Sequence, residues 1–132
     1  LKDLYKMQVF ALSRWRNAHK PKGALGPHAR VMPENVITRP PTAELREGQK
    51  DEDSLPPYKI LDGILECLIE GEMSFEETVA KGYDPATVKR IEHMLYVAEY
   101  KRRQAPPGVK LSTRNFGRDR RYPITNAYRD AR

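Results

Sequence analysis

Residues 39–58 read R-P-P-T-A-E-L-R-E-G-Q-K-D-E-D-S-L-P-P-Y, and the rest of the chain is organised around this stretch. A proline pair stands near each end, and charged side chains fill much of the interval between them. A segment with so few apolar residues cannot bury itself, so we expect a long surface loop here. Loops of this length are usually either functional lids or linkers, and composition alone favours a solvated linker.

The positive charge of the chain is concentrated at its C-terminal end. The 132 residues carry a formal net charge of +6. Residues 101–132 hold ten Lys or Arg against two Asp, which gives +8 and leaves −2 for the remainder. A basic segment of this kind indicates an anionic partner, such as nucleotide phosphates, nucleic acid or an acidic protein surface. A solvated charged terminus explains the same composition.

Length and composition predict one domain or part of one. The hydrophobic fraction is 39%, which is low for a globular domain. Because an apolar pattern follows Leu1 almost at once, we interpret the chain as a fragment. A single cysteine, Cys67, cannot form an internal disulfide, which is typical of a reducing compartment and predicts a cytoplasmic location. No apolar run approaches the length of a membrane span.

The spacing of apolar residues predicts a mostly helical fold without a sheet. Asp3 is the expected N-cap of the first helix. A capping box at Ser74 and Glu77 and the pair Asp84-Pro85 predict two further helix starts. Long coil joins the helices, and residues 104–132 read as coil. The expected helices are Leu4–Arg16, Tyr58–Glu70, Phe75–Lys81 and Pro85–Arg103.

Two long motifs resemble one known family. The stretch 39–58 is similar to the mobile loop of NAD synthetases, and E-Y-K-R-R-Q-A-P-P-G-V-K, Glu99–Lys110, is similar to the distal motif of that family. The ending F-G-R-D-R-R-Y-P-I-T-N resembles the long, glutamine-dependent bacterial form. The resemblance implies that residues 1–104 are the helical C-terminal portion of an adenine-nucleotide α-hydrolase-like (Rossmann-like α/β) synthetase domain. Residues 105–132 would form its basic tail.

The activity implied by the resemblance is ATP-dependent amidation of deamido-NAD through an adenylated intermediate. It implies ATP, Mg²⁺ and ammonia drawn from glutamine, and partnership with the remainder of a homo-oligomeric synthetase. It implies no membrane or nucleic-acid partner. The family's phosphate loop, Ser-Gly-Gly-x-Asp-Ser, does not occur in these 132 residues. We therefore expect an incomplete catalytic site and no activity from this chain alone.

The resemblance also implies roles for individual residues. Lys6, in Y-K-M-Q, and Thr42, in P-T-A-E-L, match family positions at the ATP phosphates. In E-Y-K-R-R-Q, the aromatic residue Tyr100 and the cations Lys101 and Arg102 match positions that contact deamido-NAD. The stretch 39–58 would then be a lid that shields the reactive adenylate from water.

Residue chemistry alone leaves alternatives open at each position. Lys6 beside a helix N-terminus suits a phosphate, yet it is equally an ordinary exposed lysine. The hydroxyl of Thr42 can hold a phosphate oxygen or a metal-bound water, or simply belong to a turn. Cations at a helix end, such as Lys101, complement the helix dipole without any ligand.

The acidic loop residues and the histidines do not form a recognisable metal-binding motif in the sequence. Asp51, Glu52 and Asp53 could order Mg²⁺ or the backbone of the loop, or be solvated charges, and we assign no metal ligand. His19 and His28 lack Cys or carboxylate partners at ligand spacing, and we expect both to be exposed.

Two other classes of function stay open. The first is a small nucleic-acid-binding module that uses the basic tail, and the second is a helical adaptor. Against the first, the tail offers only three stacking residues and no known nucleic-acid motif. These stacking residues are Phe116, Tyr122 and Tyr128.

Overall fold

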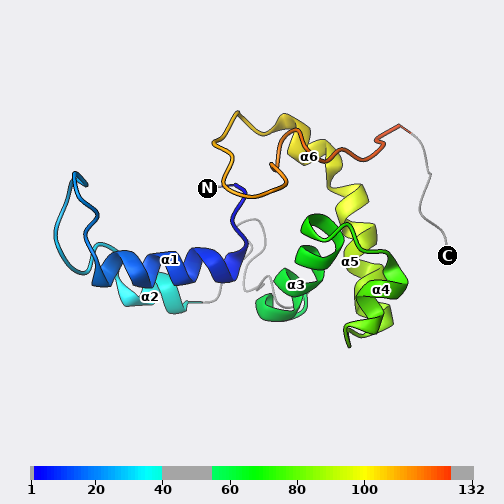
Figure 1. The fold of residues 1–132 in the computed structure, drawn as a ribbon, viewed down its shortest axis with the longest axis horizontal. Coiled ribbons are helices and arrows are strands. Elements are labelled where there is room, and N and C mark those ends of the chain that lie inside the picture. The colour runs from blue at the N-terminus through cyan, green and yellow to red at the C-terminus, as the bar shows by residue number, and fades with distance from the viewer. Residues whose placement is uncertain (1, 40–54, 126–132) are drawn as a thin grey trace, which may run out of the picture. The chain divides into compact units, whose positions relative to one another are not determined.

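The computed structural model describes residues 2–39 and 55–125. These ranges contain helices and no strand, so the prediction of a mostly helical fold is confirmed for them (Figure 1). The chain divides into two compact units, Tyr5–Tyr58 and Leu1–Leu4 with Lys59–Arg132. The elements are α1 (Lys6–Ala18), α2 (Glu34–Thr38), α3 (Tyr58–Leu65), the π-helix η2 (Glu66–Glu70), α4 (Phe75–Ala80), α5 (Pro85–Val97) and α6 (Glu99–Gln104).

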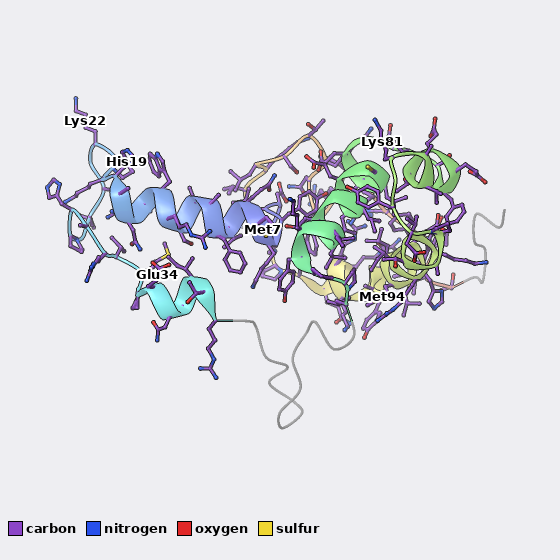
Figure 2. The ribbon with its side chains drawn as sticks, turned by 90° about the horizontal axis from the view of Figure 1, so that it is seen from below. Met7, His19, Lys22, Glu34, Lys81 and Met94 are labelled. Atoms are coloured by element: carbon purple, nitrogen blue, oxygen red, sulfur yellow. The ribbon has the colours of Figure 1, made fainter. Side chains whose placement is uncertain are left out.

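In the unit Tyr5–Tyr58, α1 and α2 lie side by side (Figure 1, Figure 2). The short helix α2 buries Ile37. Asn17, near the end of α1, closes the loop between the two helices. Its Nδ2 donates to the carbonyl of Met32 at 2.8 Å, and its Oδ1 accepts from the Met32 N–H at 2.9 Å. Lys22 extends from this loop away from both helices (Figure 2).

The first helix begins later than the sequence predicts. α1 begins at Lys6, and its N-cap is Tyr5. The prediction that Asp3 caps this helix is therefore wrong. Its carboxylate instead accepts hydrogen bonds from the backbone N–H groups of Leu111 and Phe116, far along the sequence. The segment before α1 is thus held by tertiary contacts rather than by the helix.

In the other unit, α3 runs directly into η2, and α4 packs against η2 and α5. The predicted capping box begins α4: the N–H of Ser74 donates to Glu77 Oε2 at 2.7 Å, and the N–H of Glu77 donates to Ser74 Oγ at 3.2 Å. Asp84 caps α5 by accepting from the N–H of Thr87 at 2.8 Å. Local capping chemistry therefore fixes where these two helices start.

The core of this unit is small and mostly aliphatic. Its buried members come from α3, η2, α4 and α5, and each is at most 7% exposed. Isoleucine and valine side chains of α3 and α5 supply most of it. The buried residues are Ile64, Ile69, Thr78, Val88 and Ile91.

Two helices, α5 and α6, replace the single helix predicted over residues 85–103. The helical pattern breaks at Ala98, where ψ is −2°. The carbonyl of Ala98 accepts from the N–H of Lys101, only three residues on, at 3.0 Å. A new helix therefore begins at Glu99, whose side chain is 1% exposed. A buried carboxylate needs hydrogen-bonding partners, and α6 supplies them, as described below.

Gly63, on α3, packs closely against the ring of Tyr83, and a substitution at Gly63 tests this contact. A Cβ at Gly63 would lie 2.2 Å from Tyr83 Oη and 3.1 Å from its Cζ. We expect Gly63→Ala to lower the free energy of unfolding by about 1–3 kcal/mol, because this overlap outweighs the gain of about 0.5–1 kcal/mol from alanine in a helix. Urea unfolding followed by circular dichroism measures the loss.

Two further variants control this measurement. Tyr83→Phe removes Oη, so Gly63→Ala should cost less in that background. Gly108→Ala meets only the flexible Lys2 side chain, at 3.6 Å, and should change stability little. An equal loss from Gly63→Ala with Tyr83 or Phe at position 83 would contradict the packing argument.

Candidate binding site at the end of α6

The short helix α6 presents two residues that the sequence analysis assigns to one ligand. Tyr100 is 45% exposed, and Lys101 is exposed. The Nζ of Lys101 lies 6.0 Å from the centroid of the Tyr100 ring. Because successive helical residues are rotated by about 100°, Lys101 lies opposite Glu99 on α6, and Tyr100 lies to one side of it. An aromatic ring and a cation are therefore available together to a ligand.

Arg102, assigned to the same ligand, occupies the inward side of α6 and is 7% exposed. Its Nε and Nη2 donate to Glu99 Oε2 at 3.0 and 2.5 Å. Its Nη1 donates to the carbonyl of Phe116 at 2.6 Å, and its Nη2 also donates to the carbonyl of Arg120. The guanidinium carbon lies 5.6 Å from the Phe116 ring. These contacts direct the guanidinium of Arg102 into the folded chain.

Glu99 is the centre of this cluster. Its Oε1 accepts from Arg103 Nε at 3.1 Å, while Arg102 occupies the other oxygen. Burial alone would raise the pKa of Glu99, but hydrogen bonds from Arg102 and Arg103 bring the pKa below its ordinary value of 4.5. The carboxylate is therefore ionised and fully paired at neutral pH.

The tail is held at both peptide groups of Phe116. The N–H of Phe116 donates to Asp3 Oδ1 at 2.9 Å, and its carbonyl accepts from Arg102. The other oxygen of Asp3 accepts from the N–H of Leu111 at 2.8 Å. Burial would raise the pKa of Asp3, but these N–H donors lower the pKa below its ordinary value.

Tyr122 is held in the same manner. Its carbonyl accepts from Arg103 Nη2 at 3.0 Å, and Glu99 holds that arginine through Nε. Its ring packs 4.5 Å, centroid to centroid, from the ring of Tyr96 on α5. Four side chains thus hold the tail, and we call them the tail clamp: Asp3, Glu99, Arg102 and Arg103.

Several cations of the tail are neutralised within the chain. Lys110 pairs with Asp119 at 2.6 Å, and Arg114 pairs with Glu72 at 2.5 Å. Together with the pairing of Glu99, these contacts account for part of the basic charge without an external anion. A hollow of about 680 Å³ remains beside the end of α6, and the cations that line it include Lys2, Arg103, Lys110, Arg118 and Arg121.

Lys6 lies in an aromatic setting of its own at the start of α1. Its Nζ is 5.6 Å from the ring centroid of Phe10 and 5.7 Å from that of Tyr58. The two rings meet edge to face, with centroids 6.5 Å apart. The remaining assigned residues lie outside the described part of the chain, as does most of the expected lid: Thr42, Asp51, Glu52 and Asp53.

Neither a metal cluster nor a membrane-spanning helix occurs in residues 2–39 and 55–125. No three or more His, Cys, Asp or Glu residues come together there, and no helix there combines the length and apolarity needed to cross a membrane. The predicted exposure of His19 and His28 is confirmed. The ring of His19 stacks on that of Trp15, with centroids 5.3 Å apart.

Sequence reasoning missed Glu99, Arg103 and the true role of Asp3. One signal was available: in E-x-x-R-R, Glu99 stands three and four places before Arg102 and Arg103, which is the spacing of helical ion pairs. That spacing indicates pairing but not burial. The contacts of Asp3 have no comparable local signal.

The low pKa of Glu99 predicts how stability depends on pH. A group whose pKa is lowered by folding contributes stability that is fully present above its ordinary pKa, 4.5, and is lost as pH falls through the folded pKa. The stability difference between the native chain and Glu99→Gln should therefore be largest near neutral pH and shrink below about pH 4.5. Urea unfolding at a series of pH values measures this difference.

The matched control is Glu76→Gln, at an exposed position of α4. Its stability difference should change less with pH, because Glu76 is exposed and lacks the arginine partners of Glu99. A difference for Glu99→Gln that grew on acidification would show that the carboxylate is not stabilised in the folded chain.

Comparison with known proteins places the chain in one family. A family model described as NAD synthase matches residues 1–105. The chain is 55% identical over 130 residues to the glutamine-dependent NAD(+) synthetase of Rhodobacter capsulatus, covering 98% of this chain and 24% of that protein. It is 46% identical over 130 residues to that of Thermotoga maritima, covering 98% of this chain and 21% of that protein.

A solved structure gives the same result. The glutamine-dependent NAD+ synthetase of Acinetobacter baumannii, in complex with adenosine diphosphate, matches with a TM-score of 0.53 and 38% sequence identity. The match covers 96% of this chain and 20% of that one. The chain thus spans roughly a fifth to a quarter of the length of these relatives. It belongs to the NAD synthase family.

Proposed function

We propose that the chain is the helical C-terminal part of a glutamine-dependent NAD synthetase, which amidates deamido-NAD to NAD. The observation that carries this proposal is the NAD synthase match over residues 1–105. Within this proposal, residues 1–104 complete a Rossmann-like α/β domain and include a mobile loop at about 39–58. Residues 105–132 form a basic tail, whose described part packs on α6 through Phe116 and Tyr122. The free thiol of Cys67 fits a reducing cytoplasm.

The chemistry requires activation of a poor electrophile. An oxygen of the nicotinate carboxylate attacks the α-phosphorus of ATP, and the bond to pyrophosphate breaks. The nitrogen of ammonia, which glutamine supplies, then attacks the acyl carbon, AMP leaves and a proton is released. Catalysis of this type depends on positioning the reactants and neutralising charge on the phosphates. Mg²⁺ would supply part of that neutralisation, and we assign it no ligand among the described residues.

Lys6 and Thr42 are proposed to bind the ATP phosphates. Lys6 is the first residue of α1, so it stands at a helix N-terminus, whose free N–H groups favour phosphate. The rings of Phe10 and Tyr58 limit the orientations of the Lys6 ammonium. In the proposed lid, Asp51, Glu52 and Asp53 act as charged loop residues, and closure of the lid protects the adenylate from water.

Tyr100 and Lys101 are proposed to contact deamido-NAD directly. A flat ring can stack on a base or a pyridine ring, and an ammonium has three donors for a phosphate or carboxylate oxygen. We propose that Arg102 acts in the same substrate site through the structure around it, because its donors are directed to Glu99 and to the tail.

The proposal is tested with the full-length synthetase that carries this chain. NAD formation is measured with deamido-NAD, ATP, Mg²⁺ and either glutamine or ammonia, beside the 132-residue chain alone. The synthetase should form NAD, and the chain alone should form none above background, because the family's phosphate loop is not among its residues. The proposal fails if the synthetase makes no NAD from deamido-NAD, or if deleting residues 1–132 leaves NAD formation intact.

A further inference from the structure

The helix α6 has six residues, too few to be stable in water without tertiary support. Its support comes from one side. Glu99, Arg102 and Arg103 stand at spacings of three and four, so they share a face, and that face is hydrogen-bonded to the tail. Between these anchors in sequence stand Tyr100, beside this face, and Lys101, opposite it, and both are exposed. The anchored face therefore determines where the exposed pair points.

The tail in turn is fixed at two points. Phe116 has its N–H bound by Asp3 and its carbonyl bound by Arg102. Tyr122 has its carbonyl bound by Arg103, which Glu99 holds in turn. Because both peptide groups of Phe116 and the carbonyl of Tyr122 are held by charged side chains, the tail cannot shift along α6 without breaking charge-assisted hydrogen bonds. A segment that reads as coil in the sequence thus acts as a rigid brace in this unit.

From this arrangement we propose that the tail clamp positions Tyr100 and Lys101 for deamido-NAD, which makes Glu99 and Arg102 positioning residues of the synthetase. The proposal rests on the proposed function, because it assumes that Tyr100 and Lys101 bind deamido-NAD. It assigns to the basic tail a role in substrate affinity through its backbone carbonyls.

The test uses conservative variants of the full-length synthetase. Arg102→Lys keeps the charge but loses the planar fork that reaches Glu99 and two tail carbonyls at once. Glu99→Gln keeps the shape but loses the charge. Each is expected to raise the KM for deamido-NAD roughly tenfold or more, since a misplacement of about 1 Å can cost up to a hundredfold. The KM for ATP should stay within about twofold of the native enzyme, as no clamp residue is assigned to ATP.

Matched controls make the same chemical changes at exposed positions. Arg90→Lys on α5 and Glu76→Gln on α4 should leave both KM values within about twofold of the native enzyme. Thermal melts of all variants identify any that fail to fold, and Glu99→Gln, which changes the fewest atoms, keeps the test available if Arg102→Lys does not fold.

The decisive measurement is the combination of Arg102→Lys with Lys101→Ala. A residue that acts through Lys101 adds little once Lys101 is gone, so the double variant should show nearly the same KM for deamido-NAD as Lys101→Ala alone. Arg102 with a general structural role would instead multiply the two effects and raise both KM values.

Each result has a defined meaning. Two outcomes would overturn the positioning role and leave the proposed function standing. In the first, the effects of Arg102→Lys and Lys101→Ala on the KM for deamido-NAD multiply. In the second, Lys101→Ala raises that KM, but the clamp variants behave like their controls. An unchanged KM in Lys101→Ala would remove the substrate assignment itself, and the positioning proposal would fall with it. If the native enzyme formed no NAD from deamido-NAD, the proposed function would fail, and the positioning role would fall with it.

Discussion

Replacing Arg102 with methionine is expected to lower the free energy of unfolding of the chain by about 3–5 kcal/mol, the usual cost of removing one partner from a buried ion pair. The reason is the burial of Glu99, which is 1% exposed and would lose two of its hydrogen bonds. The carbonyls of Phe116 and Arg120 would lose a charged donor at the same time. Urea unfolding followed by circular dichroism measures the change.

Two further variants separate the ion pair from ordinary packing. Adding Glu99→Gln to Arg102→Met removes the stranded charge, so the double variant should be more stable than Arg102→Met alone. Arg90→Met, at an exposed position of α5, should change stability by no more than about 0.5 kcal/mol. A loss of under about 1 kcal/mol from Arg102→Met, the range of exposed pairs, would show that the Glu99–Arg102 pair is solvated in solution.

The helices that begin with local capping chemistry are those that the sequence predicts well. Ser74 with Glu77, and Asp84 before Pro85, start α4 and α5 where expected, because each cap bonds within three residues of itself. The aliphatic positions Val88 and Ile91 are buried as the helical spacing indicates. In these cases the short-range pattern and the tertiary structure agree, and the fold follows from the sequence.

The tail clamp could not be predicted because its partners are distant in sequence. Asp3 is a good helix cap by local criteria, but its two N–H donors lie 108 and 113 positions away. Their attraction overrides the weak local preference for capping α1. In the same way, the break at Ala98 precedes a buried pair, Glu99 with Arg102, and Arg102 also binds the tail carbonyl of Phe116. Burial of this cluster depends on residues that read as coil.

The residues of the candidate site are assigned from motif resemblance, which does not indicate the direction of each side chain. The motif E-Y-K-R-R-Q treats Tyr100, Lys101 and Arg102 alike, whereas the structure separates them into an exposed pair and an inward-facing anchor. Local chemistry cannot make this distinction, because arginine and lysine at a helix end both complement the dipole. The partners in the tail decide which side chain faces inward. The roles of the exposed pair stay a prediction.

In the full-length synthetase, Lys101→Ala is expected to weaken deamido-NAD binding much more than ATP binding. Lys101 is exposed beside the ring of Tyr100, so its ammonium is free to donate to a ligand oxygen. Losing one charge-assisted hydrogen bond costs roughly 1.5–3 kcal/mol, which corresponds to a loss of affinity of about tenfold to a hundredfold. Calorimetric titration with each ligand separately measures both affinities.

The competing explanation for Lys101 makes a different prediction with the same variant. If its charge only complements the dipole of α6, Lys101→Ala should cost about 0.3–1 kcal/mol of stability and leave deamido-NAD affinity unchanged. Lys89→Ala on the exposed side of α5 serves as the control for loss of a surface cation. A lowered melting temperature with native affinity for deamido-NAD would support the dipole explanation, whereas a selective loss of deamido-NAD affinity with a native melting temperature requires a direct contact. The exposure of Lys101, opposite the anchored face of α6, favours the direct contact because little of its side chain is committed to the fold.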